Sequence, residues 1–595
     1  MYFQNYNPLG NVFLSTLVAA IPILTLLYFI ALHPHKDEEG GRHLGIAAPY
    51  AAFYAVIAAL LVSCLAFHMP VGAAVSAFAL GSFSGFLGII WIVLAAMFLY
   101  TMTVITGKFE IVKESIIHIS FDRRLQVLLI AFSFGAIIEG TSGFGTPVAI
   151  AGAVMVGLGF TPFQSAVLNL LANTAPVAWG AIGTPIVTLA AVSGLDQKTL
   201  STMAGHQLPW VSVLVPFWLV ATFVFMEGGR WKDFWEVWPG MLVSGLSFAL
   251  MQWYASGTAA LHLVTDVVAG VTSVICTALF LRVWHPRTQF LLRSDRAAGA
   301  APRMTREGWK YGFTSGQTAA AWTPWAILIL CCALWGMPTF KTTLNNLFQN
   351  VKVNTTLLGS PFNGTLSLPA WEMPDLHNKV QRTPPVVKPD AKPEAAKFTI
   401  NWLSAAGTGV FVAALLSGLY LRLSAAQWRE AMSRTARRMK VPVLVIGQLL
   451  GLGFLTRYSG TDAVLGLAFT SAGAAYPFFA AYLGWLGVFL TGSDTASNAL
   501  FGSLQRITAQ QLNLNEVLIV ATNSTGGVMG KMIDAQSIMV ACAACYESPQ
   551  ERKHALGPIF RRVWWHSVVG AGIIGLIALL QAYVFTGAIP PLPPK

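Results

Sequence analysis

One lysine differs from every other basic residue in the sequence. Lys531 lies in the segment NSTGGVMGKM, inside an apolar stretch where the chain is expected to cross a membrane. A lysine at membrane depth costs about 3 kcal/mol on insertion scales, so it persists only beside a compensating group. That group could be the carboxylate of an anionic substrate. It could equally be Asp534, which lies three residues further on and on the same helical face.

Two acidic residues occupy similar surroundings. Glu139 lies in EGTSGFGTPVAI and Asp494 lies in TGSDTASNALFG, and both segments interrupt an apolar stretch with Gly, Ser and Thr. Burial disfavours the charged form of a carboxyl group, so such a group can bind and release a proton at membrane depth. We therefore predict that Glu139 and Asp494 carry a coupling proton. Capping of a helix by Asp494 is the alternative.

A third group of residues is suited to binding an anion. Asn173 and Asn523 each begin a polar interruption of an apolar stretch, NTAPVAWGAIGTPI and NSTGGVMGKM. Broken helices expose backbone N–H groups with partial positive charge, and these groups bind carboxylates. A packing kink satisfied by neighbouring Ser and Thr is the alternative at each break. The predicted substrate-binding residues are Ser142, Asn173, Thr174, Ser493, Asn523, Ser524, Thr525, Gly526 and Lys531.

The composition is that of a membrane protein. Of the 595 residues, 55% are hydrophobic and only 10% are charged, whereas soluble proteins carry about 25% charged residues. Seven apolar blocks approach or exceed the roughly 20 residues that cross a bilayer. We therefore predict an all-α polytopic membrane protein. The blocks are 11–32, 44–67, 86–106, 207–227, 263–283, 401–422 and 563–587.

The distribution of Lys and Arg predicts the orientation of the chain. Six segments hold 25 of the 37 Lys and Arg residues and are predicted to be cytoplasmic loops, while the opposite side holds 11. The net charge of +12 is explained by these loops, so no nucleic-acid partner is expected. The assignment requires about 12 transmembrane helices and two re-entrant hairpins, with both termini outside. The six loops are 33–43, 107–124, 228–238, 282–322, 422–440 and 546–562.

The hairpins and breaks recur in two halves of the chain. Gly140 precedes Asn173 by 33 residues, and Gly492 precedes Asn523 by 31 residues. The first hairpin, at about 125–158, is predicted to enter from the cytoplasm, and the second, at about 477–505, from outside. Opposite entry makes the two halves an inverted repeat, in which a transport site lies near the bilayer midplane.

The predicted repeat defines the domain organisation. An N-terminal half, 1–322, contains the first hairpin and broken helix at about 125–190. A C-terminal half, 401–595, contains the second hairpin and broken helix at about 477–541. The segment 341–400 between them is predicted to be an external loop or small cap. Its TPPVVKPDAKPEAAK stretch is predicted not to pack a core, because it is rich in Pro, Lys and Ala.

Motifs for other classes of protein are missing from the sequence. There is no Walker loop, no HExxH and no GxSxG, so neither ATP-driven pumping nor hydrolysis is supported. We expect no enzymatic activity, no cofactor and no metal. Cys542 and Cys545 form a CxxC at the end of an apolar stretch, which we interpret as packing residues rather than metal ligands.

Six long motifs follow one another along the chain: YNPLGNVFLS, EGTSGFGTPVAI, ANTAPVAWGAIGTPI, GWLGVFLTGSDTASNALFG, NSTGGVMGKM and LQAYVFTGAIP. In order and spacing they resemble the lactate permease family of bacteria. The resemblance implies proton-coupled uptake of L-lactate, D-lactate and glycolate through the inner membrane. The implied partners are a small monocarboxylate, a proton and membrane lipid, and the oligomeric state is not predicted.

Three positions depart from the family pattern. Ala320 stands where the family has Arg, Arg457 stands where it has Asn, and Asp534-Ala535 stands where it has Ser-Pro. The last change places a carboxylate beside Lys531. A sodium-coupled carboxylate transporter is an alternative function, because broken Asn/Ser/Thr/Gly turns can also hold Na⁺ through backbone carbonyls. An anion channel is the alternative from a different class.

Overall fold

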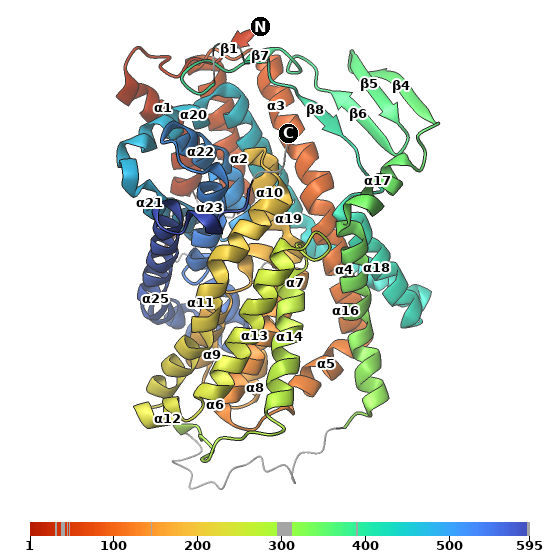
Figure 1. Cartoon of the computed structure of the whole chain (residues 1–595), viewed down its shortest axis with the longest axis vertical. Coiled ribbons are helices and arrows are strands. Elements are labelled where there is room, and N and C mark those ends of the chain that lie inside the picture. Colours follow the sequence, from red (N-terminus) through yellow and green to blue (C-terminus); the bar gives the residue numbers. More distant parts are fainter. Residues whose placement is uncertain are drawn as a thin grey trace.

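The computed structural model of the chain is mostly helical, and most of its β-strands, β1 and β4 to β8, lie at one end of an elongated bundle (Figure 1). It describes residues 1–29, 33–36, 42–44, 46, 48–143, 145–293, 312–387, 389 and 391–591. The predicted loops 33–43 and 282–322 therefore lie partly outside the described residues.

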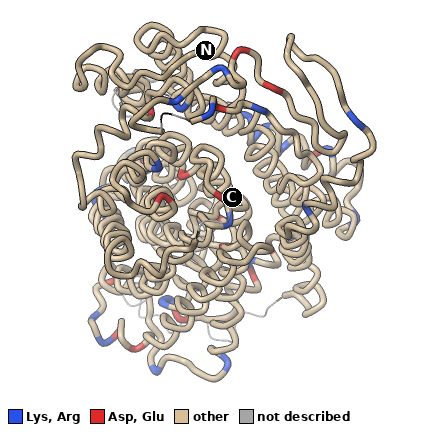
Figure 2. The backbone as a smooth tube through the Cα atoms, turned by 45° about the horizontal axis from the view of Figure 1, so that its top comes forward, with Lys and Arg blue, Asp and Glu red and all other residues tan. Residues whose placement is uncertain are grey.

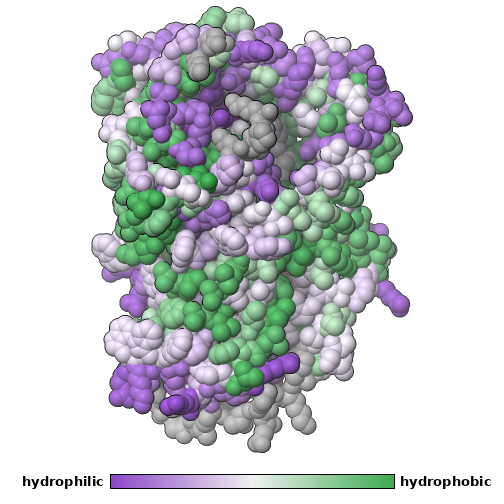
Figure 3. Space-filling model, viewed as in Figure 1, coloured by the Kyte–Doolittle hydropathy of each residue, from purple (hydrophilic) through white to green (hydrophobic). Residues whose placement is uncertain are grey.

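Long apolar helices run along the molecule. Within the described residues, eight helices are long and apolar enough to cross a membrane, or nine if one bent pair of helices counts as a single span. The surface agrees with this, because hydrophobic residues gather in a middle zone and hydrophilic residues gather at both ends (Figure 3). Figure 2 shows long stretches of helix without a charged residue. The prediction of a helical, multi-pass membrane protein is confirmed at this level.

The first helices of the chain form an outer bundle with four later ones. Their bounds are α1 (Val12–Leu27), α2 (Ala48–Leu61), η2 (Val62–Ala66), α3 (Val71–Gly85), η3 (Phe86–Ile90), α4 (Trp91–Ile105), α5 (Lys108–Ile117), α16 (Ser315–Gly336), α17 (Pro338–Asn346), α18 (Ala406–Tyr420) and α19 (Ala425–Ser459). Helix α19 packs along α2, α3 and α4. Small residues permit this contact, because a Cβ on Gly81 would lie 2.4 Å from the Leu450 carbonyl oxygen.

The remaining helices form an inner bundle in which the two halves of the chain pack together. Helices α8 and α9 contact α24, α10 contacts α22, and α11 contacts α23. The first-half bounds are α6 (Arg123–Gln126), η4 (Val127–Phe134), α7 (Gly135–Ser142), α8 (Thr146–Gly157), α9 (Pro162–Ala172), η5 (Val177–Trp179), α10 (Gly180–Ser193), α11 (Gln197–Met226), α12 (Trp231–Trp235), α13 (Trp238–Gly257) and α14 (Thr265–Phe280). The second-half bounds are α20 (Thr461–Phe469), η6 (Thr470–Ala475), α21 (Tyr476–Thr491), α22 (Asp494–Gln511), α23 (Glu516–Gly530), α24 (Ala535–Cys545), α25 (Pro549–Tyr583) and η7 (Thr586–Ala588).

A small antiparallel sheet forms a cap above the outer bundle (Figure 1). Its strand order is β4-β5-β6-β8, and β7 pairs in parallel with β1 at the N-terminus. The strand bounds are β1 (Tyr2–Phe3), β2 (Pro34–Lys36), β3 (Arg42–Leu44), β4 (Lys352–Leu357), β5 (Ser360–Thr365), β6 (Leu368–Glu372), β7 (Val380–Gln381) and β8 (Lys397–Thr399).

The prediction that TPPVVKPDAKPEAAK packs no core is wrong. Val386 is buried against Ala463 and Ile507, and Ala396 is fully buried. Glu394 forms ion pairs with Arg382 and Arg457. Composition indicated a linker, but a few apolar side chains of this stretch find partners in the helical ends beneath it.

The predicted cytoplasmic loops 422–440 and 546–562 consist largely of the first turns of two long helices. Helix α19 begins at Ala425, where Ser424 and Gln427 form a capping box, so most of 422–440 is its first turns. Helix α25 begins at Pro549, so most of 546–562 is helical as well. Basic charge alone does not distinguish a loop from a helix, because charged residues can continue a helix beyond its apolar part.

Candidate functional site

Two helical hairpins bring their tips together inside the inner bundle. The first consists of α7 and α8, and its tip has Gly143 and Gly145 at φ values of 57° and 74°. The second consists of α21 and α22, and its tip has Gly492 at φ 71°. L-residues with side chains rarely adopt such φ values, so glycine is needed to turn the chain this tightly. The helix that follows each tip points its unpaired N–H groups back toward the tip.

The first broken helix lies where the sequence predicted it. Helix α9 ends with Asn173 as its C-cap, and the chain bends by 68° before it continues into Val177–Ser193. Ala181 and Ile182 then adopt left-handed conformations, which cost about 1–3 kcal/mol each for residues with a side chain. A Cβ on Gly143 would lie 3.0 Å from Ala181 Cβ, so the first hairpin tip packs directly against this strained segment.

The second broken helix lies eight residues later than predicted. Helix α23 runs without interruption from Glu516 to Gly530, so the predicted break at Asn523 is wrong. The chain leaves the helix at Lys531 and re-enters one at α24, where Asp534 is the N-cap and accepts a hydrogen bond from the Ser537 N–H at 2.7 Å.

Gly526 allows two helices to touch rather than breaking α23. A Cβ on it would lie 2.2 Å from the Ala481 carbonyl oxygen of α21. The reverse contact is as close, because a Cβ on Gly484 of α21 would lie 1.8 Å from the Asn523 carbonyl oxygen. The polar run in the sequence is therefore a packing surface between two helices.

A small cavity of about 30 Å³ lies between the two hairpin tips. Its wall includes Gly143 of the first tip, Gly492 and Ser493 of the second, and the start of α10. The charged residues that line it are Glu139, Asp494 and Lys531. The volume accommodates about one or two water molecules, so binding of a larger ligand requires the tips to move apart.

Lys531 connects the second broken helix to the second hairpin tip. Its Nζ donates a hydrogen bond to the Gly492 carbonyl oxygen at 2.5 Å and lies 3.7 Å from Asp534 Oδ2. The lysine side chain is only 6% exposed. Asp534 Oδ2 receives no hydrogen bond within the described part of the chain, so the two charges are close but not tightly paired.

Of the two carboxyl oxygens of Asp494, one accepts hydrogen bonds from other described residues. Oδ2 accepts hydrogen bonds from Ser524 Oγ at 2.5 Å and from Asn498 Nδ2 at 3.4 Å. Oδ1 has no hydrogen-bond partner among the described residues, and a Cβ on Gly527 would lie 2.4 Å from it. The N-cap of α22 is Ser493, which accepts from the Ala496 N–H, so Asp494 is not the capping residue.

Glu139 approaches the same cavity from the first half. A Cβ on Gly180 would lie 2.6 Å from its Oε1, so glycine at that position makes room for the carboxyl group. Oε2 receives no hydrogen bond in the part of the chain that the structure describes. The carboxyl group interacts electrostatically with Lys531.

The other predicted binding residues do not line this cavity. Asn523 donates to Asn498 Oδ1 at 2.9 Å, and Thr525 donates to Gln207 Oε1 at 2.6 Å, so both join helices. Ser142 and Thr174 donate to carbonyls of their own helices. Asn173 is buried, and neither atom of its amide group has a hydrogen-bond partner among the described residues.

Sequence reasoning missed three residues beside the cavity. Thr184 of α10 and Thr495 of α22 place their hydroxyl oxygens 3.5 Å apart and so connect the two halves. Asp266, near the start of α14, is fully buried and interacts electrostatically with Glu139. Neither of its oxygens has a hydrogen bond of normal geometry within the described chain. A carboxylate at the start of the apolar stretch TDVVAGV was a signal for Asp266.

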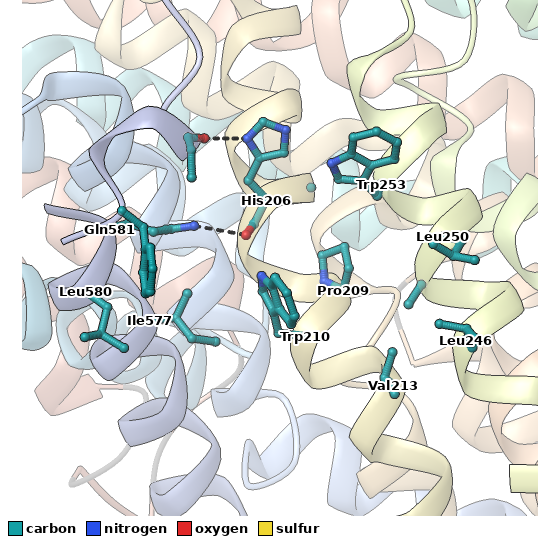
Figure 4. Close-up of a pocket in the computed structure, with 14 residues that line it drawn as sticks. His206, Pro209, Trp210, Val213, Leu246, Leu250, Trp253, Ile577, Leu580 and Gln581 are labelled. Atoms are coloured by element: carbon teal, nitrogen blue, oxygen red, sulfur yellow. Dashed lines mark hydrogen bonds between the residues drawn. The ribbon is translucent and has the colours of Figure 1, made fainter. Parts of the chain in front are cut away.

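A much larger groove, of about 760 Å³, lies on the outside of the inner bundle between α11, α13 and α25 (Figure 4). Trp210, Trp253 and Leu250 line it, and its wall contains no Lys, Arg, Asp or Glu among the described residues. A carboxylate would lose its hydration there without compensation. The groove suits lipid tails, so the small charged cavity is the candidate site.

The helical multi-pass fold and the charged cavity between two hairpin tips define a membrane transporter. The chain belongs to the L-lactate permease family, whose model matches residues 15–585. It is 42% identical over 592 residues to the glycolate permease GlcA of Escherichia coli K12, covering 98% of this chain and 99% of that one. It is 40% identical over 590 residues to the L-lactate permease of the same strain, covering 99% and 100%.

A more distant relative gives the same family. The chain is 38% identical over 590 residues to the L-lactate permease of Bacillus subtilis 168, covering 99% of each chain. Two solved transporter structures are similar over nearly the whole chain. The YdaH transporter of Alcanivorax borkumensis has a TM-score of 0.40 at 13% identity, covering 99% of this chain and 100% of that one. MtrF of Neisseria gonorrhoeae has a TM-score of 0.42 at 11% identity, covering 96% and 95%.

Proposed function

We propose that this protein imports L-lactate, D-lactate and glycolate across the inner membrane together with protons. The observation that carries the proposal is the presence of one ammonium and two carboxyl groups around a single buried cavity. Similarity to proteins named L-lactate permease and glycolate permease supports the substrate class. The partners are then a small monocarboxylate, a proton and membrane lipid.

The proposal assigns a role to each charged residue. Lys531 exchanges part of its contact with the Gly492 carbonyl for the substrate carboxylate. Asp494 and Glu139 each have an oxygen without a hydrogen bond in the described structure, so each can take up a proton. A monocarboxylate and a proton together add no net charge, which limits the cost of moving the loaded site through the membrane.

We propose an architecture of 12 spans and two re-entrant hairpins in an inverted repeat. The order of elements supports it, since in both halves a hairpin is followed by a broken helix and then by a long helix. In the first half these are α7/α8, α9/α10 and α11, and in the second half α21/α22, α23/α24 and α25. Labelling of single cysteines with an impermeant reagent tests the orientation. Labelling of a cysteine within residues 422–440 from outside intact cells would contradict the proposed orientation.

Transport itself is tested with purified protein in proteoliposomes. An imposed pH gradient in sodium-free buffer is expected to drive accumulation of labelled lactate, with saturation and with competition by glycolate. Accumulation that requires Na⁺ would show a sodium-coupled transporter instead. Flux that never saturates would show a channel. Absence of lactate or glycolate flux under every gradient would refute the assigned substrates.

A further inference from the structure

A second, larger cavity, of about 300 Å³, lies on the other side of the second hairpin tip and is open at Arg438, Val441 and Gln536, which are exposed. Its wall is formed mainly by α19 and α22, with Met97 of α4 and Gln536 of α24. It shares Gly492, Ser493 and Thr495 with the central cavity. The hairpin tip is therefore the partition between the two cavities.

Arg438 is the only charged residue in the wall of this second cavity, all of whose lining residues are described. Its Nη2 donates to Thr146 Oγ1 at 3.0 Å, at the first turn of α8 in the first hairpin. Its guanidinium lies 5.9 Å from the centre of the Tyr100 ring. No acidic side chain pairs with it among the described residues, so its remaining donors are available to an anion.

Most of the remaining wall is apolar and contains several aliphatic residues of α19, while Thr491, Ser493, Thr495 and Gln536 add polar groups. These aliphatic residues are Val441, Val445, Ile446, Leu449 and Leu450. A volume of about 300 Å³ is at the lower end for small-molecule sites. One guanidinium beside apolar walls matches a small carboxylate with a short carbon chain.

The basic first turns of α19 indicate which side of the membrane this cavity faces. The segment 422–440 holds six Lys and Arg residues and is predicted to be cytoplasmic. Arg438 lies at the membrane end of that segment. Pro442 follows within the helix and also lines the cavity, and it removes the backbone hydrogen bond to the Arg438 carbonyl.

We propose that the second cavity is the cytoplasmic vestibule of the transport route, and that Arg438 is a docking site for the substrate carboxylate within it. Substrate released past the second hairpin tip meets Arg438 before it enters the cytoplasm. Substrate moving outward docks there first. This inference rests on the proposed function, because it takes the monocarboxylate as the ligand.

Transport from each side of the membrane gives the first test. Arg438→Gln is expected to raise the half-saturating lactate concentration at the cytoplasmic face by about fivefold or more, the effect of one unit charge at about 4 Å in water. The value at the external face is expected to change by less than about twofold. Right-side-out and inside-out vesicles provide the two measurements. Arg438→Lys is expected to restore part of the cytoplasmic affinity, because it keeps the charge.

Arg437→Gln is the matched control for the same loss of charge. Arg437 is exposed, as Arg438 is, and lies one residue away on α19, but it bonds to Ser433 and does not line the cavity. It is expected to leave both half-saturating concentrations unchanged. Equal effects of Arg437→Gln and Arg438→Gln would overturn the docking role, since they would show a general surface-charge effect.

Thiol labelling gives a test that does not depend on lactate transport. Val445→Cys, in a variant whose six native cysteines are replaced, places a thiol in the cavity wall. An anionic, impermeant methanethiosulfonate is expected to react with it from the cytoplasmic face, and lactate is expected to slow the reaction. Adding Arg438→Gln is expected to lower the rate ratio of the anionic to a cationic reagent by about fivefold.

Two results would overturn the inference while leaving the proposed function intact: lactate transport with no reaction at Val445→Cys, or reaction only from outside. If no lactate is transported, the proposed function fails. Protection of Val445→Cys by another anion, dependent on Arg438, would then still support an anion vestibule. No protection by any small carboxylate would refute it.

Discussion

The Lys531 ammonium donates a 2.5 Å hydrogen bond to the Gly492 carbonyl and stays 3.7 Å from the Asp534 carboxylate. The lysine thus ties the second broken helix to the tip of the second hairpin. That tip separates the central cavity from the vestibule, so a ligand that competes for Lys531 also acts on the partition between them. The sequence predicted the proximity of Asp534, but not on a shared helix as expected: the two residues lie in the break between α23 and α24. Only the fold reveals the contact with Gly492.

We predict that Lys531→Met folds but binds lactate more weakly. Loss of one charge-assisted hydrogen bond costs about 1.5–3 kcal/mol, or roughly 10- to 150-fold in affinity. Direct binding to purified protein measures the change, and Lys440→Met on the exposed part of α19 is the control. The double variant Lys531→Met, Asp534→Ser is expected to stay weak. Near-normal affinity in the double variant would show that Lys531 serves only Asp534.

We predict that Asp494→Asn and Glu139→Gln each impair lactate accumulation driven by a pH gradient. Each change keeps the size of the side chain but removes the group that takes up a proton. At least one variant should retain exchange of lactate for lactate, because exchange need not release the proton. Asp462→Asn is the control, since Asp462 is a buried carboxyl outside the cavity that accepts from Ser503. Normal accumulation in both variants would remove these residues from coupling.

We predict that Gly526→Ala destabilises the protein strongly. Its Cβ would lie 2.2 Å from the Ala481 carbonyl oxygen, so α21 and α23 must separate. Overpacking of this kind costs about 1–3 kcal/mol or more. The thermal unfolding temperature in detergent measures the effect. Gly447→Ala is the matched control, because no atom lies within 4 Å of its Cβ. Equal unfolding temperatures for the two variants would contradict the packing role.

We predict that Glu236 stabilises the protein in a pH-dependent way at the base of the first hairpin. Burial raises its pKa, but hydrogen bonds from Thr288 and Arg124 outweigh burial and hold the pKa below its ordinary value of 4.5. A lowered pKa contributes stability that is present above the ordinary value and is lost as the pH falls through the folded-state value.

The pH prediction is tested by comparing wild type with Glu236→Gln. The difference in unfolding temperature is expected to be constant from about pH 7 to about pH 5 and to shrink toward about pH 3. Glu110→Gln is the control, because the Glu110 side chain is 61% exposed. A difference in unfolding temperature that grows as the pH falls would show that the folded-state pKa of Glu236 is raised rather than lowered.

Local sequence patterns predicted the hairpin tips and the first break, because these depend on backbone conformation. Gly143, Gly145 and Gly492 adopt positive φ values that few other residues tolerate, and such glycines are visible in a sequence. The same reasoning was wrong at Asn523. A Gly/Ser/Thr run can break a helix or can let two helices approach, and the run itself does not distinguish the two.

The sequence by itself determined the class of the protein, its family and the segments that form the two hairpin tips, since apolar length, charge placement and glycine positions are local properties. Only the tertiary structure decided which polar residues share a cavity. Thr525 donates a hydrogen bond to Gln207, 318 residues away in sequence, and does not line the cavity. Thr184 and Thr495, from different halves of the chain, both line it. The sequence did not distinguish Arg438 from its basic neighbours, because the partners of a side chain are set by the packing of distant helices.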